Sequence, residues 1–344
     1  MRALAHRARR AADRLVRPGG RGIVLLYHRV ADEPSDPYGL CVTPAAFDEH
    51  LQAIRAAGRP LRARDLAAGV AARALPDRAI CITFDDGYAD NVEAAEPLLH
   101  RYDIPATIFV TTGTAGRERE FWWDELERVF LATAELPPVL DIRIGRNRIE
   151  CPVGALAPAP GPHRRRGPGG WHLGDPDVPS ARHSSFRHVY QAVQPLPPGE
   201  RDEVMAAIVT WAGAERIVRP SRRALEPAEV AALDRRGLVE VAAHTVNHPA
   251  LPAQPPAVQR AELERSKRDL EEWTGHAIAG FAYPYGLYDD VAVAHARSVG
   301  YRYACACTHR HVRPGAEVFE LPRIEVRPGS DGDAVARLLH HQLR

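Results

Sequence analysis

One stretch constrains the fold of this chain more than any other: the apolar run AICITF at residues 79–84, which stops at Asp85, Asp86 and Gly87. A short, partly β-branched apolar run is typical of a strand buried on both faces of a parallel sheet. In α/β folds, ligands bind at the carboxyl ends of such strands. Two adjacent carboxylates there can divide two roles, since one can bind a metal while the other handles a proton. The alternative is a solvated Asp-Asp-Gly turn, which is common in proteins.

A second strand-like run, residues 238–243, leads directly into the segment HTVNH at residues 244–248. Two imidazoles four residues apart can face one metal ion on a helical turn. One carboxylate and two histidines give three protein ligands and leave a position open for water, which is the arrangement of a catalytic zinc site. Because the chain has 16 histidines, such a pair is weak evidence alone. The strand-end carboxylates make a chance pairing harder to accept.

These segments resemble the motifs of a known family. Residues 83–87 (TFDDG) and 244–248 (HTVNH), in this order, are similar to the first two motifs of the NodB-type polysaccharide deacetylases, carbohydrate esterase family 4. Residues 281–286 (FAYPYG) are similar to a third motif, and the resemblance extends from about residue 23 to about residue 324. It implies an α/β fold, a distorted or incomplete (β/α)7 barrel of the NodB homology type.

The resemblance also implies a reaction and the residues that perform it. Asp86, His244 and His248 are expected to bind a divalent metal, Zn2+ before Co2+ or Ni2+, and Asp85 is expected to be the general base. The reaction would remove N-acetyl groups from a polysaccharide or glycan precursor that contains N-acetylhexosamine. Two alternatives stay open: a related metal-dependent hydrolase of a small non-sugar amide, and a carbohydrate-binding relative without activity.

The general acid is the first departure from the family pattern. Family members commonly carry a late Leu-x-His motif, which residues 320–324 (ELPRI) lack. The first predicted strand instead ends at His28, within LYHRV at residues 26–30, and some relatives resemble this arrangement. Since the first and last strands of a barrel are neighbours, we predict His28 as the acid that protonates the leaving amine. A buried structural histidine is the alternative.

The second departure from the family pattern concerns the arginine that pairs with the base. Typical members carry it near the front of the third motif, where this chain has Gly280, Phe281 and Ala282. Arg323, at a later strand end, is predicted to replace it, with a surface salt bridge as the alternative. The expected substrate contacts are Tyr283, Pro284, Tyr285, Gly286 and Trp123. The alternative for Trp123, and the one its aromatic neighbours favour, is a core residue. Backbone N–H groups of the turn at 283–286 are expected to stabilise the oxyanion.

The domain organisation follows from strand and helix signals along the chain. About seven predicted strands alternate with helices over residues 23–344, which we interpret as one deacetylase domain. Residues 1–22 form a basic extension that lacks the apolar core of a secretory signal. Residues 137–198 are predicted to be a Pro-rich insertion, partly disordered and without regular helix where the prolines are densest.

Charge and composition limit the partners. The net charge of +1 gives no electrostatic argument for binding nucleic acid or a membrane surface. No stretch approaches the ~18 apolar residues of a transmembrane helix. Five irregularly spaced cysteines and the lack of a visible secretory signal make the cytoplasm the expected location.

Overall fold

The structure of the chain, a computed structural model, describes residues 20–144, 147–154 and 170–343. Most of the expected basic extension at residues 1–22 lies outside these ranges. Eight strands form one parallel sheet: β1 (Gly22–Tyr27), β4 (Arg59–Leu61), β5 (Ala79–Phe84), β6 (Ala106–Val110), β9 (Val239–Ala243), β10 (Gly280–Ala282), β11 (Tyr303–Cys305) and β12 (Ile324–Glu325).

The strand order confirms the incomplete barrel. Seven strands follow one another as β11-β10-β9-β6-β5-β1-β12, while β4 pairs with the start of β5. The first and last strands are neighbours, with Leu25 opposite Ile324, and Tyr27 of β1 lies opposite Phe84 of β5. The carboxyl ends of β1, β5 and β12 therefore meet at the same mouth.

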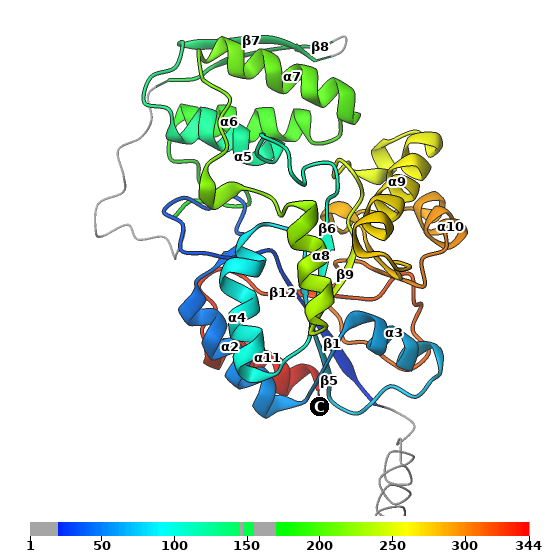
Figure 1. Cartoon of the computed structure of the whole chain (residues 1–344). Helices are drawn as coiled ribbons and strands as arrows, with labels where there is room; N and C mark the ends of the chain where they lie inside the picture. The colour runs from blue at the N-terminus through cyan, green and yellow to red at the C-terminus, as the bar shows by residue number, and fades with distance from the viewer. Residues whose placement is uncertain (1–19, 145–146, 155–169, 344) are drawn as a thin grey trace, which may run out of the picture.

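Helices cover the outside of this curved sheet (Figure 1). On one side lie α2 (Pro44–Ala57), α4 (Glu96–Tyr102) and α11 (Gly332–Gln342), and on the other α8 (Pro227–Arg236), α9 (Pro256–Thr274) and α10 (Asp290–Val299). Local signals set their ends: the Thr43 hydroxyl accepts from the Ala46 N–H at 3.2 Å at the start of α2, and Gly237 ends α8 with a φ of 77°. The short helix α3 (Ala63–Ala71) and the two-stranded β2 (Arg29–Val30) and β3 (Cys41–Val42) complete this part.

Side chains alternate between two cores along each strand. Ile80, Ile82 and Phe84 of β5 point outward and pack under the surrounding helices. Cys81 points into the barrel, where it packs with the inner residues of other strands and with α3. Continuing the alternation past the strand end places Asp85 on the inner face.

A second layer stands above the barrel and differs from the expected irregular insertion. It contains α5 (Trp122–Glu127), the hairpin of β7 (Val139–Ile144) and β8 (Asn147–Pro152), α6 (Ala181–Val193) and α7 (Pro198–Trp211), which share a separate hydrophobic core. We call this layer, formed by the described residues 121–144, 147–154 and 170–212, the cap. The prediction of irregular structure over 137–198 was wrong for the hairpin and for α6. The paired strands of the hairpin have no proline before Pro152, and Ser180 caps α6 immediately after the last proline of the run. The densest prolines, at 158–168, lie outside the described residues.

No helix among the described residues is both long enough and apolar enough to span a membrane.

Candidate metal centre and catalytic site

Strand alternation carries four of the predicted site residues to the inner face of the barrel mouth. His28 follows β1, Asp85 follows β5, His244 follows β9, and Arg323 precedes β12. In each case the adjoining strand residue, such as Tyr27, Phe84 or Ala243, belongs to the outer core. Asp85 is fixed directly beside His28, since its N–H donates to the Tyr27 carbonyl at 3.0 Å.

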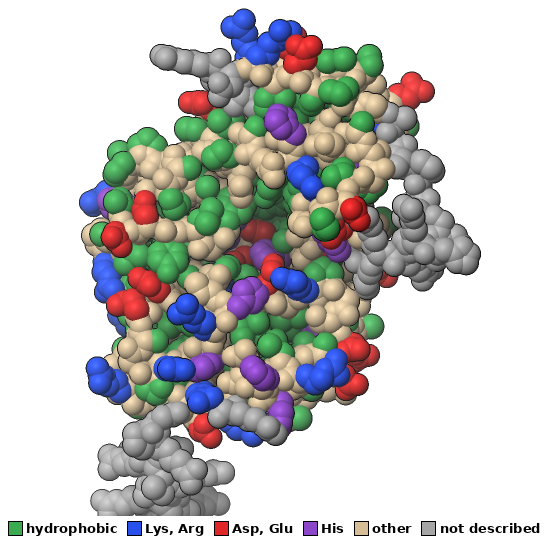
Figure 2. Space-filling model, turned by 180° about the vertical axis from the view of Figure 1, so that it is seen from behind, with side chains coloured by type: hydrophobic (Ala, Val, Ile, Leu, Met, Phe, Trp, Pro, Cys, Tyr) green, Lys and Arg blue, Asp and Glu red, His purple; other side chains and the backbone are tan. Residues whose placement is uncertain are grey.

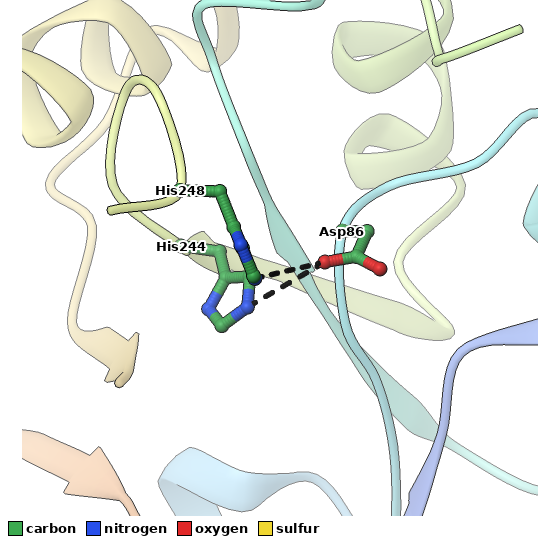
Figure 3. A group of neighbouring side chains, drawn as sticks. All are labelled: Asp86, His244 and His248. Atoms are coloured by element: carbon green, nitrogen blue, oxygen red, sulfur yellow. Dashed lines mark ion pairs between the residues drawn. The ribbon is translucent and has the colours of Figure 1, made fainter. Parts of the chain in front are cut away.

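Asp86, His244 and His248 converge on one point (Figure 3). The Nε2 atoms of His244 and His248 lie 3.7 and 3.3 Å from the same oxygen of Asp86, Oδ1. One ligand atom from each residue falls within 4.8 Å of the others, and all three side chains are buried. Two imidazole nitrogens and one carboxylate oxygen form the donor set of an open zinc site.

The position of the proton on the His244 ring indicates that Asp86, His244 and His248 together fit a cation. Its Nδ1 lies 2.8 Å from the carbonyl oxygen of Ala282, so Nδ1 carries the proton and Nε2 presents a lone pair to Asp86. Burial, together with the charge of Asp85, raises the pKa of Asp86 well above its usual value. Asp86 Oδ1 is buried without a hydrogen-bond partner among the described residues. A cation among these atoms would remove the repulsion between lone pair and carboxylate.

Asp85 forms a buried, two-point ion pair with Arg323. The two terminal nitrogens of Arg323 lie 2.6 and 2.7 Å from the two carboxylate oxygens, and its Nε donates to the Ala306 carbonyl at 3.2 Å. Burial alone would raise the pKa of Asp85, but Arg323, aided by His244, lowers it below its ordinary value. Asp85 is therefore ionised, with Oδ2 3.8 Å from His244 Nε2.

The ring of His28 lines the same cavity as Asp85 and Glu325. Burial lowers the pKa of His28 below its usual value, while the charges of Asp85 and Glu325 act in the opposite direction. The residue is half-buried, so it reaches the cavity and is not sealed in the core.

The histidine segment is not the helical turn that its spacing suggested. Thr245 and His248 both have positive φ, 64° and 53°, and the segment is an irregular turn. Glu262 of α9 holds it, accepting from the N–H groups of Val246 and Asn247 at 2.8 Å each. The two imidazoles thus meet through a braced loop rather than through helical periodicity.

Backbone strain concentrates in this site. Seven described residues other than glycine have positive φ, and four of them, Asp86, Thr245, His248 and Tyr285, lie here. Such conformations cost about 1–3 kcal/mol each and persist where the surroundings hold them. At Asp86, φ is 73° and the next residue, Gly87, has φ of 82°, a sharp turn that lets both carboxylates face the cavity.

The cavity between barrel and cap has a volume of about 340 Å³. Trp123 lines it, with its ring centroid 4.8 Å from that of His248, and its Nε1 donates to the Tyr88 hydroxyl at 2.7 Å. Leu173 and Tyr190 line it from within the insertion. The insertion therefore supplies part of the wall of the site.

Some residues of the third motif, 281–286, line the cavity, and others are buried in the core. Tyr285 and Gly286 line the cavity, and Gly286 is required there because a Cβ would lie 2.4 Å from Cys307 Cβ. Tyr283 is buried, and its hydroxyl donates to the Phe319 carbonyl at 3.0 Å. Pro284 is buried in the short turn that follows. The structure thus places Tyr283 and Pro284 behind the turn that faces the cavity.

Several residues around the site were not predicted from the sequence. Glu325 could have been found, because it lies two residues after Arg323 on the same face of β12. Glu262 falls at core spacing on α9, with Leu263 and Ser266 also buried. Arg201 of the cap, which donates to the carbonyl oxygens of Asn247 and His248, gave no sequence signal.

Comparison with known proteins shows that parts of the chain are similar to one family. A model of the polysaccharide deacetylase family matches residues 72–136 and 203–304, which include Asp85, Asp86 and both histidines. A curated candidate polysaccharide deacetylase of Bacillus subtilis, YxkH, is 27% identical over 108 residues. The match covers 31% of this chain and 37% of that relative, so it spans little more than a third of the relative's length.

Solved structures share the fold. IcaB from Ammonifex degensii superposes with a TM-score of 0.57 at 19% identity, over 93% of this chain and 97% of that one. The deacetylase PplD of Streptococcus pyogenes, solved with acetate, gives 0.54 at 18% identity, over 93% and 98%. A candidate polysaccharide deacetylase of Bacillus anthracis gives 0.57 at 16% identity, over 93% and 69%. The common feature is a parallel, seven-stranded incomplete barrel.

Proposed function

We propose that this chain is a member of the polysaccharide deacetylase family, whose model matches two of its segments, and that it is a metal-dependent hydrolase of N-acetyl groups on a polysaccharide or glycan precursor containing N-acetylhexosamine. One observation carries the proposal: the ionised Asp85 lies beside the Asp86, His244 and His248 group in a single cavity. A protein that only binds carbohydrate has no need for a base in that place.

The metal-binding group and the base have separate tasks. Asp86, His244 and His248 would hold the cation, most simply Zn2+, which supplies Lewis acidity that polarises a carbonyl oxygen and acidifies water. Asp85 would accept a proton from the attacking water. Arg323 keeps Asp85 charged and fixes both of its oxygens, so the base is oriented before substrate arrives.

The opposite wall of the cavity would complete the reaction. The Gly286 and Leu287 N–H groups donate to the Tyr283 and Pro284 carbonyls, and the Tyr285 N–H is the group of this turn that we assign to the developing oxyanion. His28, across the mouth from this turn, would donate a proton to the leaving amine. Trp123 and Tyr285 would pack against the sugar.

Acetate release tests the proposal. Protein stripped of metal and then reloaded with Zn2+ is expected to release acetate from N-acetylglucosamine oligomers. The metal-stripped protein and the Asp85→Asn variant are expected to release little. A zinc-loaded wild-type protein that binds these oligomers and releases no acetate would contradict the enzymatic part of the proposal.

A further inference from the structure

A second hollow adjoins the catalytic cavity. It has a volume of about 800 Å³ and is lined mainly by residues 308–311 and 313–317, with Tyr288, Glu320, Pro322 and Gln342 around them. His309 lines both hollows, so the two hollows meet at this residue. We call the second hollow the basic groove. Figure 2 shows Lys or Arg and His side chains gathered below the central hollow of this face.

The two arginines of the basic groove are available, whereas one of its two carboxylates is paired with a cation. Glu317 pairs with Arg297 at 2.6 Å, and Glu320 accepts from the Tyr288 hydroxyl at 3.3 Å. Arg310 and Arg313 are both exposed, and neither forms an ion pair with a carboxylate in the described part of the chain. With Glu317 paired and Glu320 still charged, the two arginines leave the groove with a net positive charge for a ligand.

Arg313 is oriented for binding. Its Nε donates to Nε2 of His311 at 2.9 Å, which requires that nitrogen of the imidazole to be unprotonated. Burial, together with Arg313 and Arg21, lowers the pKa of His311, in agreement with a neutral ring. With Nε committed, the two terminal nitrogens of Arg313 remain as a planar fork. Such a fork matches the paired oxygens of a carboxylate or a phosphate.

The spacing suits a glycan that already occupies the catalytic cavity. Arg310 directly follows His309, and the four residue steps from His309 to Arg313 span at most ~14 Å. Both arginines therefore lie close in the chain to His309, the residue that lines both the catalytic cavity and the basic groove.

We propose that the basic groove binds an anionic substituent, a carboxylate or a phosphate, on a sugar unit next to the one that is deacetylated. The inference rests on the proposed function and narrows its substrate class from any N-acetylhexosamine glycan to an anionic one. Arginines that were only solvated surface residues would give no preference between charged and neutral glycans.

Three oligomers of equal length test the proposal on the zinc-loaded full chain. One alternates N-acetylglucosamine with glucuronate, one is a phosphodiester-linked N-acetylhexosamine oligomer, and one is the neutral chitin oligomer. Wild-type protein is expected to have a higher kcat/KM on at least one anionic oligomer than on the chitin oligomer. The anionic oligomer that is preferred shows whether the groove binds a carboxylate or a phosphate. The Arg310→Gln/Arg313→Gln variant is expected to lose about threefold to twentyfold on that oligomer, as two exposed ion pairs predict, while its kcat/KM on chitin stays unchanged.

The control is Arg268→Gln, which removes an exposed arginine of α9 away from the groove and is expected to keep the preference. Added salt is expected to reduce the preference in wild type and not in the double variant. A wild-type protein without preference, or a double variant that retains it, would overturn the inference.

Direct binding of the same oligomers, measured by calorimetry, separates this inference from the proposed function. Anionic preference in binding that depends on Arg310 and Arg313, without acetate release from any oligomer, would support the groove and contradict the deacetylase. Acetate release from the chitin oligomer, with no preference for anionic oligomers in binding or turnover, would support the deacetylase and contradict the groove.

Discussion

Removing Arg323 should expose the cost of keeping the charged base inside the barrel. Arg323 is fully buried and touches both oxygens of Asp85, so Arg323→Met keeps most of the side-chain volume while leaving a buried carboxylate without its partner. Breaking a buried pair on one side costs about 3–5 kcal/mol. Because domains of this kind have a free energy of unfolding of about 5–15 kcal/mol, the variant should fold with a large loss of stability.

The loss of stability in Arg323→Met should depend on pH, and the pKa of Asp85 gives the direction of that dependence. In wild type the pKa of Asp85 is lowered, so the pair stabilises the protein above the unfolded-state pKa, and this contribution is lost as pH falls through the folded pKa. Without Arg323, burial raises the pKa of Asp85 instead. The deficit of Arg323→Met should therefore be largest at neutral pH and shrink as acid protonates Asp85.

Urea unfolding of metal-free protein, followed by circular dichroism at several pH values, measures these effects without linkage to metal binding. The double variant Asp85→Asn/Arg323→Met should recover at least ~2 kcal/mol relative to Arg323→Met, since no buried charge remains. Arg268→Met, on the surface of α9, is the matched control and should be near wild type. A cost below ~1 kcal/mol for Arg323→Met, or strictly additive single costs in the double variant, would refute the reasoning.

The remaining predictions concern the metal and the chemistry. Asp86→Ala, His244→Ala and His248→Ala should each lose bound zinc and activity together; stoichiometric zinc in purified His244→Ala would exclude it as a ligand. Asp85→Asn should retain zinc and lose activity ~10²–10⁴-fold, and a variant within a few-fold of wild type would rule out the base. His28→Ala should slow an amide substrate far more than an aryl acetate ester, which needs no proton on its leaving group; equal losses would exclude the acid role. The pKa of His28 is lowered, so its protonated form is lost at a lower pH than for an ordinary histidine. Wild-type kcat/KM on the amide should therefore decrease as the pH rises through this lowered pKa.

Much of the barrel was predictable because its local signals agree with its tertiary structure. The run 79–84 is β5 residue for residue, and Thr43, Pro44 and Gly58 bound α2 as their capping chemistry predicts. Parallel strands have their carboxyl ends at one mouth, so strand-end residues far apart in the sequence, such as Asp86 and His244, could be expected to meet. The alternation of side chains along each strand also predicts which strand-end residues face the inside of the barrel.

The rest depended on contacts that no local pattern encodes. The turn that carries His248 is set by Glu262 from α9 and by Arg201 from the cap, residues 14 and 47 positions away in the sequence. The cap itself was obscured because proline density suggested irregular structure, although Ser180 begins a regular helix immediately after it. Tyr190, which that helix carries into the cavity, could not be placed without knowing that the cap folds over the mouth.

The role proposed for Arg323 illustrates how a barrel can take a functional side chain from a different strand. In the deacetylases that the motifs resemble, the corresponding arginine is expected from the third motif, near β10, which is three strands from β5 on one side of the sheet. Arg323 comes from the end next to β12, two strands from β5 on the other side. Because the sheet curves around the mouth, inner-face side chains from both directions point toward its centre, where Asp85 lies. A long guanidinium side chain can therefore reach the base from either direction, and the strand that supplies it matters less than the face on which it lies.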